Sequence, residues 1–421
     1  MAALFVGLLI YLVSSPAHAQ DFRQVFTSVT PANFDSGGAV SRQFHLNAES
    51  YLTMSTVARR TEARKLVFSP RPELARQFVS REGGDSSLAD YAAQDPLLDG
   101  VIVLHDGVVV FEAYPNMHPW QRHFAWSVTK VVTSTALAAL VEDGLVDMDA
   151  PIERYLPVLA NSDWAGIPVR DVANMASGID CLDSDGYQDP ATCIYTMEES
   201  LGITATTGRE LDFVEHLRKM RRHRPPGTRH EYVSANTNVL GLVIEAVSGK
   251  PYATALQELI WNSIGAESDA LVAISGAGYA YASGGLHARL RDVARFGQIY
   301  VQPEVSSVLS GPMIRQIQDG GIALAPEELE GLKEGLGDDL PVRGSWQWDL
   351  VWSDGALFKS GYSGQGLYVD PARKLVIAWF GTGLDFSAQT NQMLPVARQL
   401  ARSGLFGSPG VLLPGTSTEK H

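Results

Sequence analysis

One segment near the end of the chain constrains the fold more than any other. Residues 375–380 read LVIAWF, an unbroken apolar run that follows Asp370 and Pro371. A short continuous apolar run of this kind is typical of a strand that is buried on both faces in the middle of a sheet. Another strand is expected just before it, at residues 366–369, and a helix after it, from about residue 391 to 402. The late part of the chain therefore supplies central strands.

The early part of the chain carries a second strand signal. Two β-branched runs, residues 101–104 and 108–111, flank Asp106 and Gly107, and an Asp-Gly pair in this position predicts a hairpin. Helix and loop signals dominate between about residues 145 and 290. We therefore expect a sheet built from both ends of the chain, with a helical lobe inserted between them.

Residues 1–19 have the features of a secretory signal peptide. An apolar run at residues 4–13 is followed by the small-x-small sequence AHA at residues 17–19, which would place cleavage before Gln20. The absence of Lys or Arg before the run departs from the usual pattern. A membrane anchor is the alternative, but the run is short for a span and is broken at residues 14–16 by SSP. We expect a secreted or periplasmic protein with no membrane span after cleavage.

Charge and cysteine content narrow the classes of partner and site. The net charge of −14 disfavours nucleic acid and anionic membranes as partners, because their phosphates would be repelled. The two cysteines, Cys181 and Cys193, lie close together, and export favours a disulfide between them over two free thiols. Neither two cysteines nor the histidine spacing provides a zinc site, so we expect no metal.

Ser127 and Lys130 form a Ser-x-x-Lys motif at the start of a helix expected over residues 127–143. Residues three apart share a helix face, so the lysine nitrogen can reach the serine hydroxyl. A serine needs a nearby base to act as a nucleophile, and a buried lysine with a lowered pKa can serve as that base. The alternative is an ordinary N-cap serine. The motif recurs at Ser417 and Lys420, in a tail where nothing holds a catalytic geometry.

Two further motifs follow in a fixed order. Residues 232–234 read YVS ahead of an apolar helix at 238–247, and residues 359–361 read KSG ahead of the penultimate strand. Penicillin-recognising enzymes require three elements in this order: Ser-x-x-Lys, a central tyrosine element and a Lys-Thr-Gly-like strand motif. The chain resembles the β-lactamase-related serine hydrolases: class C β-lactamases, D-alanyl-D-alanine peptidases, β-lactamase-fold esterases and 6-aminohexanoate-dimer hydrolases.

The resemblance covers about residues 95–405. Its other matching stretches are WSVTK (126–130), MASGI (175–179), YVSAN (232–236), ASGGL (282–286), RDVARFG (291–297) and GYSGQG (361–366). It implies an α/β (α+β) fold, with an antiparallel sheet flanked by helices and an inserted all-helical lobe, as in β-lactamases and penicillin-binding proteins. The expected organisation is a signal peptide (1–19), an N-terminal region (20–95) packing on the catalytic domain, the hydrolase domain (96–405) and a flexible tail (406–421).

The resemblance also implies roles for particular residues. Ser127 would attack the carbonyl, while Tyr232 and Lys130 would manage the proton. The backbone N–H groups of Ser127 and Tyr362 would form the oxyanion hole, and water would hydrolyse the acyl-enzyme without any cofactor. The candidate substrate-binding residues are Ser234, Lys359, Ser360, Gly361 and Trp348.

Two of these candidates have specific interpretations. Lys359 would offer a cation to a substrate carboxylate, as in β-lactamases and peptidases. Trp348 belongs to an aromatic run with Trp346 and Trp352, which either lines an acyl pocket or packs in the core. The sequence alone favours neither interpretation of the run.

The expected function is hydrolysis of small carboxylic esters or amides. Tyr-x-Ser stands where class C β-lactamases usually carry Tyr-x-Asn, and Gly364-Gln365 is most similar to the esterase and 6-aminohexanoate-dimer hydrolase branch. A class C-like β-lactamase, a D-Ala-D-Ala carboxypeptidase and a penicillin-binding sensor without turnover remain alternatives. An α/β-hydrolase is disfavoured, because the chain contains no Gly-x-Ser-x-Gly elbow.

Overall fold

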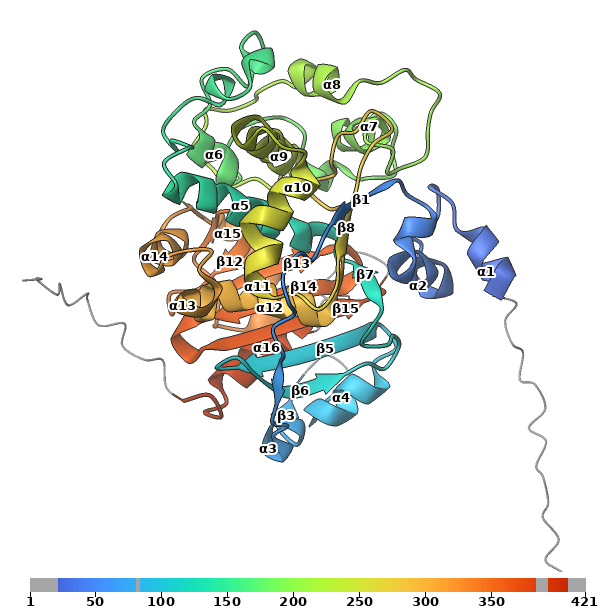
Figure 1. Ribbon diagram of the computed structural model, residues 1–421, viewed down its shortest axis with the longest axis vertical. Helices are drawn as coiled ribbons and strands as arrows, with labels where there is room; N and C mark the ends of the chain where they lie inside the picture. Colours follow the sequence, from blue (N-terminus) through green and yellow to red (C-terminus); the bar gives the residue numbers. More distant parts are fainter. Residues whose placement is uncertain (1–21, 81–83, 384–392, 408–421) are drawn as a thin grey trace, which may run out of the picture.

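The computed structural model describes residues 22–80, 84–383 and 393–407. The expected signal peptide and most of the expected tail lie outside these ranges. The described chain has a lobe built around a large sheet and a mostly helical lobe beside it (Figure 1). The predicted fold class, an antiparallel sheet flanked by helices with an inserted helical lobe, is confirmed.

Within the described residues, the main sheet has nine strands. In spatial order they are β10 (Ile322–Ala323), β11 (Arg343–Ser345), β12 (Trp348–Val351), β13 (Leu357–Gly361), β14 (Gln365–Asp370), β15 (Leu375–Gly381), β5 (Leu98–His105), β6 (Val108–Ala113) and β2 (Val67–Phe68). The pairs are antiparallel except β2 with β6, which is parallel. The apolar run at 375–380 is β15, which is buried along its whole length and lies between β14 and β5.

Helices cover both faces of this sheet. On one face, α12 (Leu290–Val301) crosses β14, β15 and β5. On the other face lie α4 (Leu88–Gln94), against β5 and β6, and α16 (Met393–Arg402), against β14 and β15, with α15 (Pro326–Leu336) beside α16. Each face buries its own apolar cluster, which explains why the central strands are continuous apolar runs.

The helical lobe is organised around two buried helices that contact each other. They are α5 (Thr129–Glu142) and α9 (Ser234–Ser248). The other helices of this lobe are α6 (Val169–Ala173), α7 (Cys193–Ser200), α8 (Phe213–Lys219), α10 (Tyr252–Leu256) and α11 (Asn262–Ile264). A disulfide joins Cys181 to Cys193, the first residue of α7.

The stretch predicted to be all-helical, residues 145–290, contains two strands near its end. β8 (Ala270–Ala273) and β9 (Leu286–Arg289) join β1 (Met54–Val57) and β7 (Arg122–Phe124) in a second sheet. The strands are only four residues long, and their partners come from distant parts of the chain. Such short segments carry too little local periodicity to be recognised from sequence.

Residues 22–80 do more than pack on the hydrolase lobe. They contribute β1 to the second sheet and β2 to the edge of the main sheet, while α2 (Gly38–Leu46) packs against β7. The remaining elements are α1 (Phe22–Ser28), α3 (Pro72–Ala75), β3 (Phe78–Val79), β4 (Ser86–Ser87), α13 (Pro303–Ser306) and α14 (Gly311–Asp319). Across the described ranges, we find no helix with the length and apolarity needed to cross a membrane.

Candidate active site

Ser127 lies in a tight turn between β7 and α5. The turn Trp126–Val128 is a single 3-10 turn, and Trp126 adopts a φ of 45°, a left-handed conformation that is uncommon for a bulky residue. As the motif spacing predicts, Lys130 Nζ lies 3.0 Å from Ser127 Oγ. Lys130 Nζ also donates to the carbonyl of Ser283 at 2.8 Å, which fixes the amine beside the hydroxyl.

The protonation state of Lys130 is set mainly by its burial. Burial lowers the pKa of Lys130 to about 7, the Asp183 carboxylate opposes this shift, and the Lys359 cation reinforces it. A substantial fraction of Lys130 is therefore a neutral amine at neutral pH. A neutral amine at 3.0 Å from Ser127 Oγ can accept its proton.

Tyr232 connects the serine to a second lysine. Its hydroxyl shares a hydrogen bond with Ser127 and accepts one from Lys359 Nζ at 2.9 Å. The side-chain nitrogens of both lysines also face its ring, at 5.1 Å from the ring centroid for Lys130 and 4.6 Å for Lys359. Burial, with the carboxylates of Asp349 and Asp183, raises the pKa of Tyr232 well above its ordinary value, so the hydroxyl keeps its proton and can donate it.

Lys359 is not the free cation that the sequence suggested. Its side chain has no exposed area, and its Nζ forms an ion pair with Asp349. The second oxygen of Asp349 accepts hydrogen bonds from Ser360 N at 2.8 Å and Ser360 Oγ at 2.6 Å. The charge of Lys359 is therefore compensated inside the protein, and Asp349 is a site residue that the sequence interpretation missed.

The prediction that Trp348 binds substrate is wrong. Trp348 is 1% exposed and packs edge-on against Tyr300 of α12, with ring centroids 5.1 Å apart. Trp348 therefore belongs to the apolar cluster that α12 covers, together with Tyr300 and Val351. Trp346 and Trp352 are also buried, and the core interpretation of the aromatic run is the correct one.

Ser234 also differs from its expected role. It begins α9, and both its N–H and its hydroxyl donate to the Asp183 carboxylate, at 2.7 and 2.5 Å. Tyr187 donates to the same carboxylate. Ser234 therefore holds Asp183 in place near the two lysines rather than facing a ligand.

Gly361 and Tyr362 bring the end of β13 against the nucleophile turn. A Cβ on Gly361 would lie 2.8 Å from the carbonyl oxygen of Ala125, so only glycine allows this approach. The ring of Tyr362 meets that of Trp126 at 5.6 Å, and Ser363 has a φ of 66°. The backbone of residues 361–363 therefore runs beside Ser127, where an oxyanion hole requires it.

A small cavity of about 20 Å³ opens at Ser127, enough for roughly one water molecule. Its walls include Phe34 and Asp35 from the N-terminal region, and Tyr187 and Glu198 from the helical lobe. Burial raises the pKa of Glu198 to about 8, and its carboxyl accepts a hydrogen bond from Tyr281 OH at 2.6 Å. The sequence interpretation named none of these residues, because distant segments bring them together.

Known proteins match most of the chain. Residues 96–401 match the family model "Beta-lactamase". The chain is 30% identical over 319 residues to a 6-aminohexanoate-dimer hydrolase of Paenarthrobacter ureafaciens, covering 73% of this chain and 80% of that protein. It is 30% identical over 149 residues to Esterase EstB of Burkholderia gladioli, covering 33% and 36%.

Solved structures agree with these matches. A putative 6-aminohexanoate-dimer hydrolase from Bacillus anthracis superposes with a TM-score of 0.76 at 23% identity, covering 90% of this chain and 96% of the other. EstCE1, a hydrolase with promiscuous acyltransferase activity, gives a TM-score of 0.57 at 14% identity, covering 74% and 94%. At these identities the structural likeness concerns the fold. With the family match over residues 96–401, it follows that the chain belongs to the Beta-lactamase family and is a serine hydrolase of the β-lactamase-related group.

Proposed function

We propose that this protein hydrolyses small carboxylic esters and amides through an acyl-enzyme on Ser127. Residues 1–19 further lead us to propose that it acts after export, as a secreted or periplasmic enzyme. The relatives named as esterases and 6-aminohexanoate-dimer hydrolases support this substrate class.

In the proposed reaction, Ser127 Oγ attacks the substrate carbonyl. Its proton passes to neutral Lys130, either directly or through the hydroxyl group of Tyr232, which shares a hydrogen bond with Ser127. The backbone N–H groups of Ser127 and Tyr362 stabilise the oxyanion. As the bond between the acyl carbon and the leaving group breaks, Tyr232 donates a proton to the leaving oxygen or nitrogen, and the proton taken from Ser127 passes from Lys130 to Tyr232, so that both groups regain their starting protonation states. Water then attacks the ester of Ser127, and the same groups return the serine to its starting state.

The ion pair between Lys359 and Asp349 is the observation that favours neutral substrates over substrates with a carboxylate. A β-lactam or a D-Ala-D-Ala peptide presents a carboxylate, and the lysine that would bind it is fully buried and already paired. Asp35 and Glu198 also line the cavity at Ser127, and they offer no attraction to an anion. A neutral ester or amide meets neither obstacle.

A panel of substrates tests this proposal. We expect short-chain p-nitrophenyl esters and a linear amide dimer whose carboxyl end is esterified to be turned over with higher kcat/KM than a chromogenic cephalosporin or a D-Ala-D-Ala peptide. A phosphonate probe should label wild-type protein and Ser417→Ala, which keeps Ser127, but not Ser127→Ala. Labelling that persists in Ser127→Ala would exclude this serine as the nucleophile. A cephalosporin that outperforms every ester would overturn the substrate class, and a burst without turnover would indicate a sensor.

A further inference from the structure

A second, larger cavity of about 490 Å³ lies on the far side of Tyr232. Its volume is in the range of small-molecule sites. Its polar lining includes Tyr232, Ser360 and His230, together with the carboxyl groups of Asp183, Glu328 and Asp349. Its apolar lining includes Leu324, Leu332, Leu336, Leu350, Phe358 and Leu394. The strands β12 and β13 form one side of this cavity, and the helices α15 and α16 form the other.

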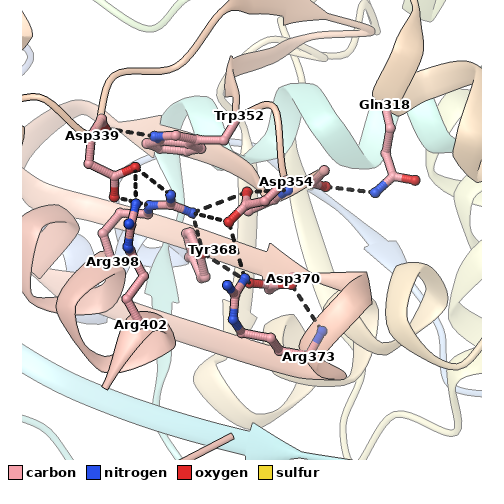
Figure 2. A network of polar contacts seen from close by, with 11 residues as sticks. Gln318, Asp339, Trp352, Asp354, Tyr368, Asp370, Arg373, Arg398 and Arg402 are labelled. Atoms are coloured by element: carbon pink, nitrogen blue, oxygen red, sulfur yellow. Dashed lines mark hydrogen bonds and ion pairs between the residues drawn. The ribbon is translucent and has the colours of Figure 1, made fainter. Parts of the chain in front are cut away.

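The two helices are held to each other by a network of charged side chains (Figure 2). Arg398 of α16 donates two hydrogen bonds to the carboxylate of Asp339, which follows α15, at 2.9 and 2.7 Å. Arg398 also reaches Asp354 and donates to Tyr368 OH at 3.0 Å, and its guanidinium lies over the ring of Trp352. This network fixes α15 and α16 relative to the sheet, so the cavity between them is preformed.

The start of α15 is also tied to the segment that carries Tyr232. His230 Nδ1 lies 3.1 Å from Glu328, in the first turn of α15. His230 precedes Tyr232 by two residues, so the position of the cavity wall is coupled to the position of the proposed proton donor.

The two cavities have no lining residue in common. Ser127 opens into the cavity of about 20 Å³, whereas the larger cavity reaches Tyr232 and Ser360 and does not include Ser127 among its lining residues. Tyr232 bonds to Ser127 and, in the proposed reaction, gives its proton to the leaving atom. The half of the substrate that carries the leaving atom must therefore lie beside Tyr232, which lines the larger cavity.

We propose that this larger cavity is the leaving-group subsite, and that it binds the apolar alcohol or amine half of a substrate whose acyl half is short. This inference rests on the proposed function. When the acyl–oxygen or acyl–nitrogen bond breaks, the leaving atom takes the Tyr232 proton and the neutral alcohol, or the amine, remains in the cavity. An anionic leaving group is disfavoured there, because Asp183, Glu328 and Asp349 are among the lining residues.

Two isomeric esters test the assignment of the two halves. Hexyl acetate and ethyl hexanoate have the same composition and differ only in which half is long. We expect kcat/KM, measured from the rate at which carboxylic acid is released, to be at least tenfold higher for hexyl acetate than for ethyl hexanoate. Along a series of acetates from methyl to hexyl, each buried methylene should raise kcat/KM about fourfold. A preference for ethyl hexanoate, or a flat acetate series, would overturn the proposal.

A matched pair of variants tests the cavity itself. Leu332→Trp fills the space with a larger ring, whereas Glu334→Trp adds the same ring at an exposed position of the same helix. We expect Leu332→Trp to lower the ratio of kcat/KM for hexyl acetate over methyl acetate at least tenfold, and Glu334→Trp to leave that ratio unchanged. Equal ratios in all three proteins would contradict the proposal.

Binding of 1-hexanol separates this inference from the proposed function. Titration calorimetry on Ser127→Ala should detect binding of 1-hexanol, and the added Leu332→Trp substitution should abolish it. If wild-type protein hydrolyses no ester but this binding pattern holds, the proposed function fails and the cavity assignment to an apolar ligand stands. If esters are hydrolysed and 1-hexanol does not bind, the subsite assignment fails and the proposed function stands.

Discussion

The indole nitrogen of Trp126 donates a hydrogen bond to Nε2 of His45, 2.9 Å away. Trp126 immediately precedes Ser127, and His45 lies on α2, outside the segment that matches the family model. An acceptor at Nε2 requires a neutral ring with its proton on Nδ1, which faces Thr382 Oγ1 at 3.3 Å. Burial lowers the pKa of His45 well below its ordinary value, which keeps the ring neutral. The N-terminal region therefore supports the turn that presents Ser127.

His45→Leu should lower both stability and turnover. It leaves the buried indole N–H without an acceptor, which costs about 1–3 kcal/mol in the free energy of unfolding, and it frees the turn before Ser127. We expect the kcat of His45→Leu to fall about tenfold with little change in KM. The kcat of His45→Gln should be much nearer to that of the wild type, because its amide oxygen can accept the hydrogen bond from Trp126. Urea unfolding and steady-state kinetics measure the two effects. A normal kcat in folded His45→Leu would restrict His45 to a stabilising role.

The acid limb of the pH profile should report Lys130. Its pKa, lowered by burial to about 7, places the neutral amine above pH 7 and the ammonium below it. We therefore expect kcat/KM to fall as the pH drops through 7, tenfold for each further unit. Lys130→Ala should lose about two to four orders of magnitude in kcat, and its residual activity should lack this limb. A wild-type limb centred near pH 5 would point to a carboxyl group instead.

Tyr232→Phe removes the proposed proton donor. We expect a loss of about two to four orders of magnitude in kcat, and a double variant with Lys130→Ala that is little worse than either single one, because both serve one proton path. Steady-state rates with one ester are sufficient for this comparison. Losses that multiply in the double variant would mean that the two groups act independently.

Asp349→Asn should change which substrates the site accepts. The variant removes the partner of Lys359, so the buried ammonium gains from a carboxylate on the substrate. We expect the ratio of kcat/KM for monoethyl adipate over diethyl adipate to rise about tenfold, while overall rates fall because Lys359 also bonds Tyr232. Asp338→Asn, at an exposed position, is the matched control. An unchanged ratio would show that other groups exclude anions.

The disulfide should stabilise the segment that carries Asp183. Cys181 precedes Asp183 by two residues, and Cys193 begins α7, which carries Glu198. The purified protein should show no free thiol until it is unfolded and reduced. Replacing both cysteines with serine should cost about 3 kcal/mol or less in the free energy of unfolding, from the loop entropy of the unfolded chain. Two thiols that titrate in native protein would refute the pairing.

The elements that were predicted correctly are those whose pattern lies within a short stretch of consecutive residues. The apolar run became β15, the Asp-Gly hairpin became β5 and β6, and the i, i+3 spacing placed Lys130 beside Ser127. Each of these depends on a few consecutive residues, so the sequence contains the whole pattern.

The residues that were missed depend on contacts between distant segments. Asp349 acts through Lys359 on the next strand, Asp183 through Ser234, and Phe34 reaches Ser127 from the N-terminal region. Trp348 was misassigned because its role depends on which face of β12 it occupies. Simple alternation would have placed Trp348 on the face of Leu350, whereas it packs with Val351 and Tyr300 in the other apolar cluster. A register shift between β11 and β12 accompanies this irregularity, and short strands carry little signal of such shifts.

The pairing of β15 with β5 has a consequence for how the chain acquires its structure. It joins Leu375 to His105, residues from opposite ends of the hydrolase domain, and such nonlocal pairs form slowly because a long loop must close first. The contacts between α5 and α9 span a shorter stretch of chain. On a ribosome, or after dilution from denaturant, helical signal should therefore appear before catalytic competence. The turn at Ser127 is completed only when Gly361 arrives beside Ala125, so the enzyme becomes active at the end of its folding rather than during it.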